Sequence, residues 1–289
     1  MSLQGSNHLM KDEMKIGFHT VGLHSRSMPE VCGRVSAAGY DTIELNAERL
    51  PWAEPHVTPS IPRDDIEEMA TLCSKAGLPV SAICAHIPLV FADREAGASS
   101  VEYVKGCMGL APLFDTKIVH VISGAADTSL SDVENWRRFV DAMAELVDHA
   151  SWNGIVFAVE PIVGHVCASI TDLNRLFADL AGSKVSVNFD PSHFIVQGIE
   201  PSEVVSRFGD RIVHVHLKDG LGRFPDFAFP PLGQGEINFP RLIADLNAVR
   251  YNGVLSVEYE AQTFGYDWSE DDILAKSVEF AREALAAAS

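Results

Sequence analysis

RIVHVH, at residues 211–216, is a short apolar run that alternates with histidine, and it has three counterparts in the second half of the chain. The counterparts are GIVFAVE (154–160), VSVNFD (185–190) and GVLSVE (253–258). Each run has the length and the β-branched content of a buried strand. Each also ends on a side chain that can bind a metal, and these are Glu160, Asp190, His216 and Glu258.

Strand-like and helix-like segments alternate along the whole chain, which predicts βα units and a parallel sheet. The predicted strands are 15–19, 40–45, 78–86, 116–122, 154–160, 184–190, 211–217 and 253–260. Amphipathic stretches such as 62–77, 131–154 and 269–287 separate them. Eight such units fit a single (β/α)8 TIM barrel, whose usual size is about 250 residues. We expect residues 1–13 to be a flexible N-terminal lead-in and residues 14–289 to form the barrel domain.

A glycine recurs just before several predicted strands, in AAGYD, KAGLP, WNGIV and YNGVL, at Gly39, Gly77, Gly154 and Gly253. Glycine is favoured where a helix ends in a left-handed turn. The pattern therefore predicts one kind of αβ loop that is used repeatedly.

Alternate residues of a strand share a face, so each of the four runs has an apolar face and a mixed face that carries the terminal ligand. In a barrel we expect the apolar face to meet the helices and the mixed face to point inward. The four ligands then converge at the C-terminal rim, where barrel enzymes keep their active sites.

A single acidic residue at a strand end is usually solvated or caps a helix. Three carboxylates that converge out of water would repel one another unless a cation or protonation neutralised them. The set therefore predicts one divalent metal ion held by Glu160, Asp190, His216 and Glu258, since hard cations prefer oxygen with some nitrogen.

Other side chains are expected near this rim. His193 can turn back beside the metal from FDPSH, whereas His214 lies one layer below His216 and is expected to be a hydrogen-bonded core residue. Glu260 shares a face with Glu258. Further residues at or near strand tips are His19, Glu44, His86 and His120, of which His86 is taken as a candidate substrate contact. Loop candidates for substrate binding are Lys218, Arg223 and Trp52, with Phe224, Phe227 and Phe229 beside Arg223.

Composition narrows the classes of partner. The net charge of −18 argues against a surface that grips nucleic acid. Five scattered cysteines without a CxxC pair indicate buried thiols in a reducing cytoplasm. No segment has the length of a membrane span, so we expect a cytoplasmic protein that binds no membrane. Barrels of this type often pair, so a homo-oligomer is compatible with the sequence.

The motifs AVEP (158–161), FDPSH (189–193), VHVHLKD (213–219), PLGQGEINF (231–239) and LSVEYE (255–260) resemble the sugar phosphate isomerase/epimerase family. This is the xylose isomerase-like TIM barrel superfamily, which includes ketose 3-epimerases, hydroxypyruvate isomerases, inosose dehydratases and dehydroshikimate dehydratases. The resemblance covers nearly the whole chain and does not name a substrate.

The resemblance implies that the two glutamates, Glu160 and Glu258, bind the metal and also form the acid/base pair. It implies that Asp190 and His216 complete the ligand set and that His193 orients a substrate oxygen. Manganese is the metal implied first, with magnesium, cobalt or zinc as alternatives. The chain departs from the ketose 3-epimerases at two substrate-contacting positions, where Val166 replaces a glutamate and Gly222, next to Arg223, replaces an arginine.

A cation on a carbonyl and its neighbouring hydroxyl makes the α-proton removable by a nearby carboxylate, through an enediolate. The sequence therefore predicts a metal-dependent isomerase or epimerase of a ketose or a related small hydroxy-carbonyl sugar. The same first step also serves a dehydratase of a keto-inositol or of dehydroshikimate. Two other classes stay open, namely a metal-dependent phosphodiesterase of the apurinic endonuclease type and a non-catalytic sugar-binding barrel.

Overall fold

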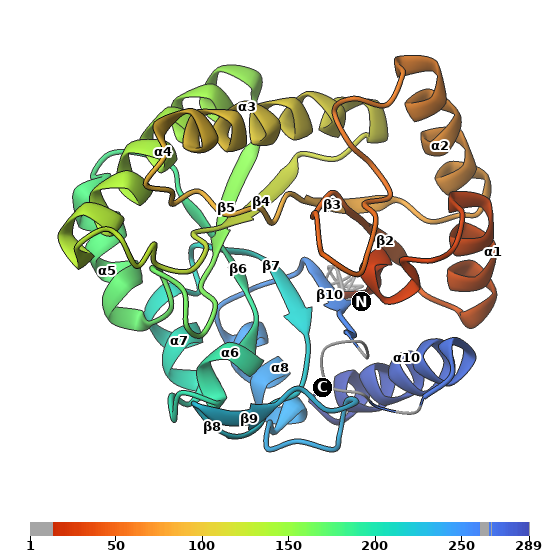
Figure 1. Ribbon diagram of the computed structural model, residues 1–289. Helices are drawn as coiled ribbons and strands as arrows, with labels where there is room; N and C mark the ends of the chain where they lie inside the picture. The colour runs from red at the N-terminus through yellow and green to blue at the C-terminus, as the bar shows by residue number, and fades with distance from the viewer. Residues whose placement is uncertain (1–13, 261–265, 267, 289) are drawn as a thin grey trace, which may run out of the picture.

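Eight parallel strands close into a barrel in the computed structural model, which describes residues 14–260, 266 and 268–288 (Figure 1). Around the barrel the strand order is β1-β10-β7-β6-β5-β4-β3-β2, and β2 pairs with β1 to complete the ring. The strands are β1 (Lys15–His19), β2 (Thr42–Asn46), β3 (Val80–Cys84), β4 (Ile118–Ile122), β5 (Val156–Glu160), β6 (Ser186–Phe189), β7 (Ile212–Leu217) and β10 (Val254–Val257). The predicted (β/α)8 TIM barrel is confirmed. Each strand lies within its predicted range, except that β2 ends at Asn46, just beyond its predicted range.

Helices form an outer ring around the barrel, as Figure 1 shows when the molecule is viewed along the barrel. They are α1 (Met28–Ala38), α2 (Arg63–Lys75), α3 (Arg94–Leu110), α4 (Asp132–Asn153), α5 (Ile170–Asp179), α6 (Pro191–Ile195), α7 (Pro201–Phe208), α8 (Phe239–Ala248) and α10 (Glu270–Ala287). The described residues also form two 3-10 helices: η1 (Thr20–Leu23) lies between β1 and α1, and η2 (Ala111–Phe114) lies between α3 and β4. No helix in the described part of the chain is both long enough and apolar enough to cross a membrane.

The last helix, α10, joins the two ends of the ring. Arg34 of α1 binds Glu270 and Asp271 at the start of α10, and Tyr40 donates a hydrogen bond to the carbonyl of Leu274 at 3.0 Å. These contacts link segments more than 230 residues apart. The predicted lead-in at residues 1–13 falls outside the described residues.

Three of the four predicted helix-ending glycines adopt the left-handed conformation, with φ of 89° at Gly39, 72° at Gly77 and 68° at Gly154. The prediction was wrong for Gly253, which has no positive φ. The left-handed turn after α8 is made by Arg250 instead, with φ of 64°. A Cβ at Gly253 would come within 2.6 Å of the Tyr251 hydroxyl, so any larger residue there would force the Tyr251 ring to move.

The apolar faces of the strands form the core between barrel and helices. Phe157, Val159, Val187, Phe189 and Leu255 are at most 1% exposed and belong to one hydrophobic cluster. The mixed faces point into the barrel, because His216 of β7 contacts Glu44 of β2 although two strands separate them in the ring. All five cysteines are buried free thiols, as expected.

A short antiparallel hairpin follows β7, which the sequence had indicated only as a loop. It consists of β8 (Leu221–Arg223) and β9 (Asp226–Ala228). The segment after it, residues 233–237, folds around Asp219, whose carboxylate accepts hydrogen bonds from the N–H groups of Gly233, Gly235 and Ile237. A Cβ at Gly235 would lie 2.2 Å from Asp219 Oδ1. The backbone of the motif PLGQGEINF thus binds Asp219, and this contact keeps the segment 233–237 beside the rim of the barrel.

Candidate functional site

The structure brings the four predicted ligands together at the C-terminal end of the barrel. Glu160 ends β5, Asp190 follows β6, His216 lies near the end of β7 and Glu258 follows β10. All four are at most 6% exposed, and one donor atom of each lies within 4.8 Å of the others.

His216 and Asp190 turn specific atoms toward this cluster. Nδ1 of His216 lies 3.1 Å from Glu160 Oε2 and 3.5 Å from Glu258 Oε2. Asp190 uses Oδ1 to accept a hydrogen bond from the backbone N–H of Ser192, at the start of α6, at 2.7 Å. Its Oδ2 is buried and has no hydrogen-bond partner among the described residues.

Burial and neighbouring charges set the ionisation of the cluster. Burial raises the pKa of Asp190 to about 7, and the Lys218 ammonium offsets part of this rise while Glu160 and Glu258 add to it. Burial acts the same way on Glu258, but there Lys218 and His216 prevail and hold its pKa well below the usual range. The cluster therefore combines a carboxylate that stays ionised, Glu258, with one whose pKa lies near neutral pH, Asp190.

Lys218 is a buried ammonium that is fixed beside the cluster. Its Nζ lies 2.8 Å from Glu258 Oε2, 2.7 Å from Glu260 Oε2 and 4.7 Å from the centre of the Phe229 ring. Burial alone would lower the pKa of Lys218, but these carboxylates raise it well above the ordinary value. Lys218 pairs with the two glutamates, whereas the neighbouring Asp219 binds the 233–237 loop.

His193 and His86 lie next to the cluster. His193 Nε2 is 3.5 Å from Asp190 Oδ2 and 3.6 Å from Glu160 Oε1, and its ring meets Phe229 edge-on. His86 Nε2 lies 3.6 Å from Glu160 Oε2. His214 is fully buried, and its Nδ1 donates a hydrogen bond to Asn188 Oδ1 at 3.1 Å, as expected for a core residue.

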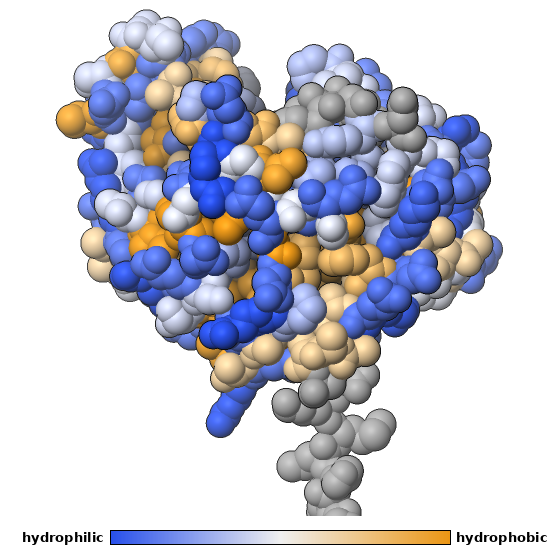
Figure 2. Space-filling view, turned by 90° about the horizontal axis from the view of Figure 1, so that it is seen from below, coloured by the Kyte–Doolittle hydropathy of each residue, from blue (hydrophilic) through white to orange (hydrophobic). Residues whose placement is uncertain are grey.

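A cavity of about 480 Å³ opens directly above the cluster. Its lining includes Glu48, His86, Glu160, His165, His193, Lys218, Phe227, Phe229, Glu258 and Glu260. Figure 2 shows the side of the molecule on which β8, β9 and α10 lie in Figure 1, and its upper outline is notched between two lobes. The cavity volume of about 480 Å³ is that of a pocket that binds a small molecule.

Two of the predicted substrate contacts do not line this cavity. The Arg223 side chain is 51% exposed on the hairpin and binds Glu236 at 2.7 Å. Trp52 is half-buried and packs edge-on against His24. A substrate contact for either residue stays a prediction.

Two polar residues near the site, Asn188 and Glu48, were not predicted as site residues, whereas Glu44 had been expected near the rim. Asn188 donates from Nδ2 to Glu160 Oε2 and also approaches His120 Nδ1. Glu44 lies below the cluster and contacts His120 and the cluster member His216. Glu48 faces the cavity from the loop after β2. The sequence signal for Asn188 was its place on the inward face of β6, and the signal for Glu44 was its place near a strand tip. Glu48 lies in a loop, where strand alternation predicts nothing.

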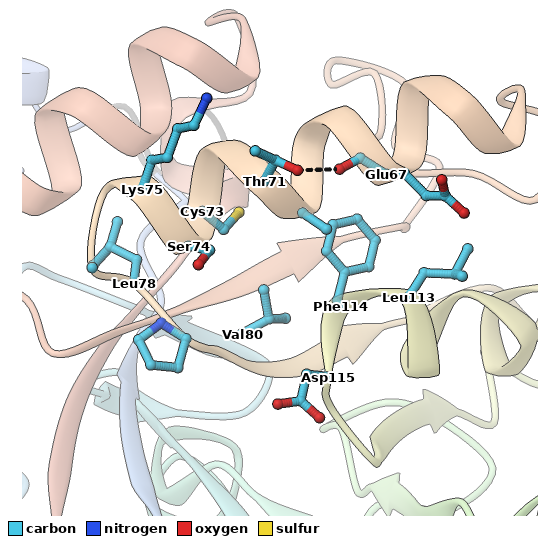
Figure 3. Close-up of a pocket in the computed structure, with 13 residues that line it drawn as sticks. Glu67, Thr71, Cys73, Ser74, Lys75, Leu78, Val80, Leu113, Phe114 and Asp115 are labelled. Carbon is cyan, nitrogen blue, oxygen red and sulfur yellow. Dashed lines mark hydrogen bonds between the residues drawn. The ribbon is translucent and has the colours of Figure 1, made fainter.

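A second cavity, of about 780 Å³, lies at the opposite end of the barrel between α2, the turn before β3 and η2 (Figure 3). Thr71, Ser74, Leu78, Leu113 and Phe114 surround it. Thr71 Oγ1 donates back to the carbonyl of Glu67, so its hydroxyl is already used. None of the metal-capable clusters found in the described part of the chain includes a residue of this cavity.

The donor set at the strand tips fits a divalent cation. Three carboxylates and one imidazole suit manganese, magnesium or zinc, and no thiol belongs to this group of four. The unpartnered Oδ2 of Asp190, together with Nδ1 of His216 between two carboxylates, is the arrangement that a bound cation would satisfy.

A family model matches most of the chain, and curated relatives match it at low identity. The family model described as xylose isomerase-like TIM barrel matches residues 32–284. An inosose dehydratase of Lacticaseibacillus casei is 25% identical over 162 residues, so the match spans about half of each protein, namely 49% of this chain and 54% of the relative. An inosose dehydratase of Geobacillus thermodenitrificans is 22% identical over 95% of this chain and 96% of its own length.

Solved structures share the fold. The structure of an L-ribulose 3-epimerase has a TM-score of 0.76 at 19% identity and covers 95% of each chain. The 3-keto-D-glucoside 4-epimerase of E. coli has a TM-score of 0.77 at 17% identity, over 94% of this chain and 100% of its own. The IOLI protein, solved with a zinc atom, has a TM-score of 0.77 at 18% identity, over 94% and 98% of the two chains.

Proposed function

This chain belongs to the xylose isomerase-like TIM barrel family, and on that premise we propose that it is a divalent-metal-dependent isomerase or epimerase of a ketose or a related small hydroxy-carbonyl sugar. The observation that carries the proposal is the buried group Glu160, Asp190, His216 and Glu258, of which Glu160 and Glu258 line a pocket of about 480 Å³. A cavity of this size accommodates one small sugar.

In this proposal the four residues hold one metal ion, with manganese first and magnesium, cobalt or zinc as alternatives. When bound, the ion would act as a Lewis acid toward a carbonyl oxygen and its neighbouring hydroxyl. That role requires donors that stay in place, and here the four side chains are buried at the ends of four separate strands.

Glu160 and Glu258 are the proposed acid/base pair. Both line the cavity, so their carboxylates border the space that a substrate would occupy. In this proposal Glu258, whose carboxylate Lys218 holds in the ionised form, accepts the proton from the carbon next to a carbonyl. Return of a proton to the opposite face gives epimerisation, and return at the adjacent carbon gives isomerisation.

Three further residues are proposed to bind the substrate. His193 lies over Glu160 and Asp190, where it can orient a substrate oxygen, while Lys218 and His86 border the same cavity. Phe229 packs against both His193 and Lys218 and gives the pocket an apolar wall.

Dehydration is the second candidate, because the relatives described above are named inosose dehydratases. It begins with the same proton removal and ends with loss of a β-hydroxyl. A keto-inositol is the substrate that this alternative indicates.

Metal analysis of the purified protein tests the proposal first. Proton exchange in heavy water should then be followed with a panel of ketoses, hydroxypyruvate and keto-inositols. Stoichiometric metal, with deuterium entering one substrate beside its carbonyl, is the expected result. Glu160→Gln and Glu258→Gln should lose the exchange, whereas Glu236→Gln, in the segment 233–237 outside the cavity, should retain it.

Each result that contradicts the proposal would indicate a different class of protein. Absence of metal after supplementation with each of the four cations would overturn the proposal. Stabilisation by a sugar without any exchange would identify a binding barrel. Cleavage of an abasic duplex by a zinc-containing preparation would identify a phosphodiesterase.

A further inference from the structure

Glu44 of β2 lies inside the barrel, directly below the four-residue group, and is fully buried. Its Oε1 lies 2.7 Å from His120 Nε2 and 3.1 Å from His216 Nε2, and its Oε2 accepts the Ser256 hydroxyl at 2.5 Å. Glu44 belongs neither to the proposed ligand set nor to the cavity lining. One carboxylate thus receives donors from three different strands.

For neutral rings, these contacts favour one tautomer in both histidines. A carboxylate accepts hydrogen bonds, so His120 and His216 each present an N–H at Nε2. The proton-free nitrogen of His120 is then Nδ1, which accepts from His86 Nε2 at 2.8 Å. In His216 the same assignment leaves Nδ1 to face Glu160 and Glu258 at 3.1 and 3.5 Å.

We propose that Glu44 is a positioning residue that directs Nδ1 of His216 to the metal ion and, through His120, orients His86 at the cavity. The inference rests on the proposed function, since it concerns the metal held by the four ligands. Metal-binding histidines usually donate their second ring N–H to a carboxylate or carbonyl, and this contact fixes both the tautomer and the ring orientation.

The arrangement has a consequence for His86. Its Nε2 proton is committed to His120, so any contact with substrate must use its other ring nitrogen or its ring face. The chain Glu44–His120–His86 therefore connects the floor of the barrel to the cavity wall without passing through a metal ligand.

The metal affinity of Glu44→Gln tests the proposal, with Mn²⁺ titrated into metal-free protein and free Mn²⁺ followed by electron paramagnetic resonance. Glutamine keeps the shape but replaces one acceptor oxygen with an NH2 donor, so it cannot accept from all three partners. Loss of such an outer partner lowers metal affinity about 10- to 100-fold, and that weakening is expected here.

Thr42→Val is the matched control. Thr42 lies two residues before Glu44 on β2, on the same face and equally buried, and its hydroxyl has no hydrogen-bond partner among the described residues. Its Mn²⁺ affinity should equal that of the unaltered protein. If the unaltered protein binds Mn²⁺ and Glu44→Gln binds it equally tightly, the inference is overturned while the proposed function stands. If the unaltered protein binds no metal, both fall.

A second measurement uses the unaltered chain, in case Glu44→Gln does not fold. Nitrogen-15 resonances of the histidines in zinc-loaded protein report which ring nitrogen is protonated and which binds metal. We expect His216 to bind zinc through Nδ1 and to carry its proton on Nε2. Zinc on Nε2, or an Nε2 without a proton, would overturn the inference.

Discussion

Lys218 Nζ lies 2.8 Å from Glu258 Oε2, inside a site where both side chains are at least 94% buried. The same ammonium reaches Glu260 at 2.7 Å and approaches Asp190 Oδ2 at 3.9 Å. A single lysine thus neutralises part of an otherwise anionic pocket. This charge balance allows the carboxylates to be buried side by side.

Replacing Lys218 by methionine should destabilise the metal-free protein by about 3–5 kcal/mol, because removal of one partner leaves buried charge uncompensated. Added Mn²⁺ should narrow the difference, because the cation replaces the lost positive charge and therefore stabilises the folded variant more than the folded unaltered protein. Urea unfolding with and without Mn²⁺ measures both effects. Lys276→Met is the control, because this half-exposed lysine pairs with Asp272 on the surface of α10 and should cost less than about 1 kcal/mol. Equal losses in the two variants would contradict the prediction.

Asp190→Asn should retain the hydrogen bond of Oδ1 to the Ser192 N–H but remove the charge that faces the cluster. We expect its Mn²⁺ affinity to fall at least 100-fold, which exceeds the roughly 10- to 100-fold cost of losing an outer partner. Calorimetric titration of metal-free protein is the measurement. Because the start of α6 stays capped, the melting temperature without metal should not fall. A drop in that temperature, with affinity unchanged, would show that Asp190 acts structurally.

His56 should make the fold sensitive to acid. Its Nε2 donates to the carbonyl of Arg26, its Nδ1 has no partner among the described residues, and burial lowers its pKa to about 4. Between pH 6.5 and 4 the unfolded chain binds a proton that the folded chain does not, so stability falls with falling pH. The contribution lost is about 3 kcal/mol, at 1.36 kcal/mol per pKa unit.

The free energy of unfolding of the protein and of His56→Gln, measured from pH 7.5 to 4, tests this point. The variant lacks the titrating group, so its stability should decline less over that window. Parallel curves would show that His56 is not responsible for the acid sensitivity.

Arg223→Ala should leave KM unchanged and alter stability by less than about 1 kcal/mol, because the half-exposed Arg223–Glu236 pair lies outside the cavity. Phe229→Ala should raise KM, since that ring contacts His193 and Lys218 within the cavity. Steady-state kinetics on the substrate identified by deuterium exchange compares the two. A raised KM in Arg223→Ala alone would restore the sequence-based expectation that this arginine binds substrate.

The strand pattern was sufficient to predict the barrel and the place of the four candidate ligands. Alternation along a strand is local, and it assigns Phe157 and Glu160 to opposite faces without knowledge of any other segment. The turn glycines were predicted for the same reason, except where Arg250 adopts the left-handed turn that Gly253 had been expected to make.

Which charged and polar side chains contact one another across the barrel depends on the closure of the strands into a ring. Glu44 meets His216 over 172 residues of chain, and Lys218 selects Glu258 and Glu260, about 40 residues away, over the adjacent Asp219. Such contacts depend on ring closure and on the depth of each side chain, and no periodicity records either. The sequence by itself thus determined the strands, their inward faces and a convergent set of carboxylates and imidazoles. Only the tertiary structure decided which of them touch, because burial forces each charged group to find a partner among neighbours that the fold supplies.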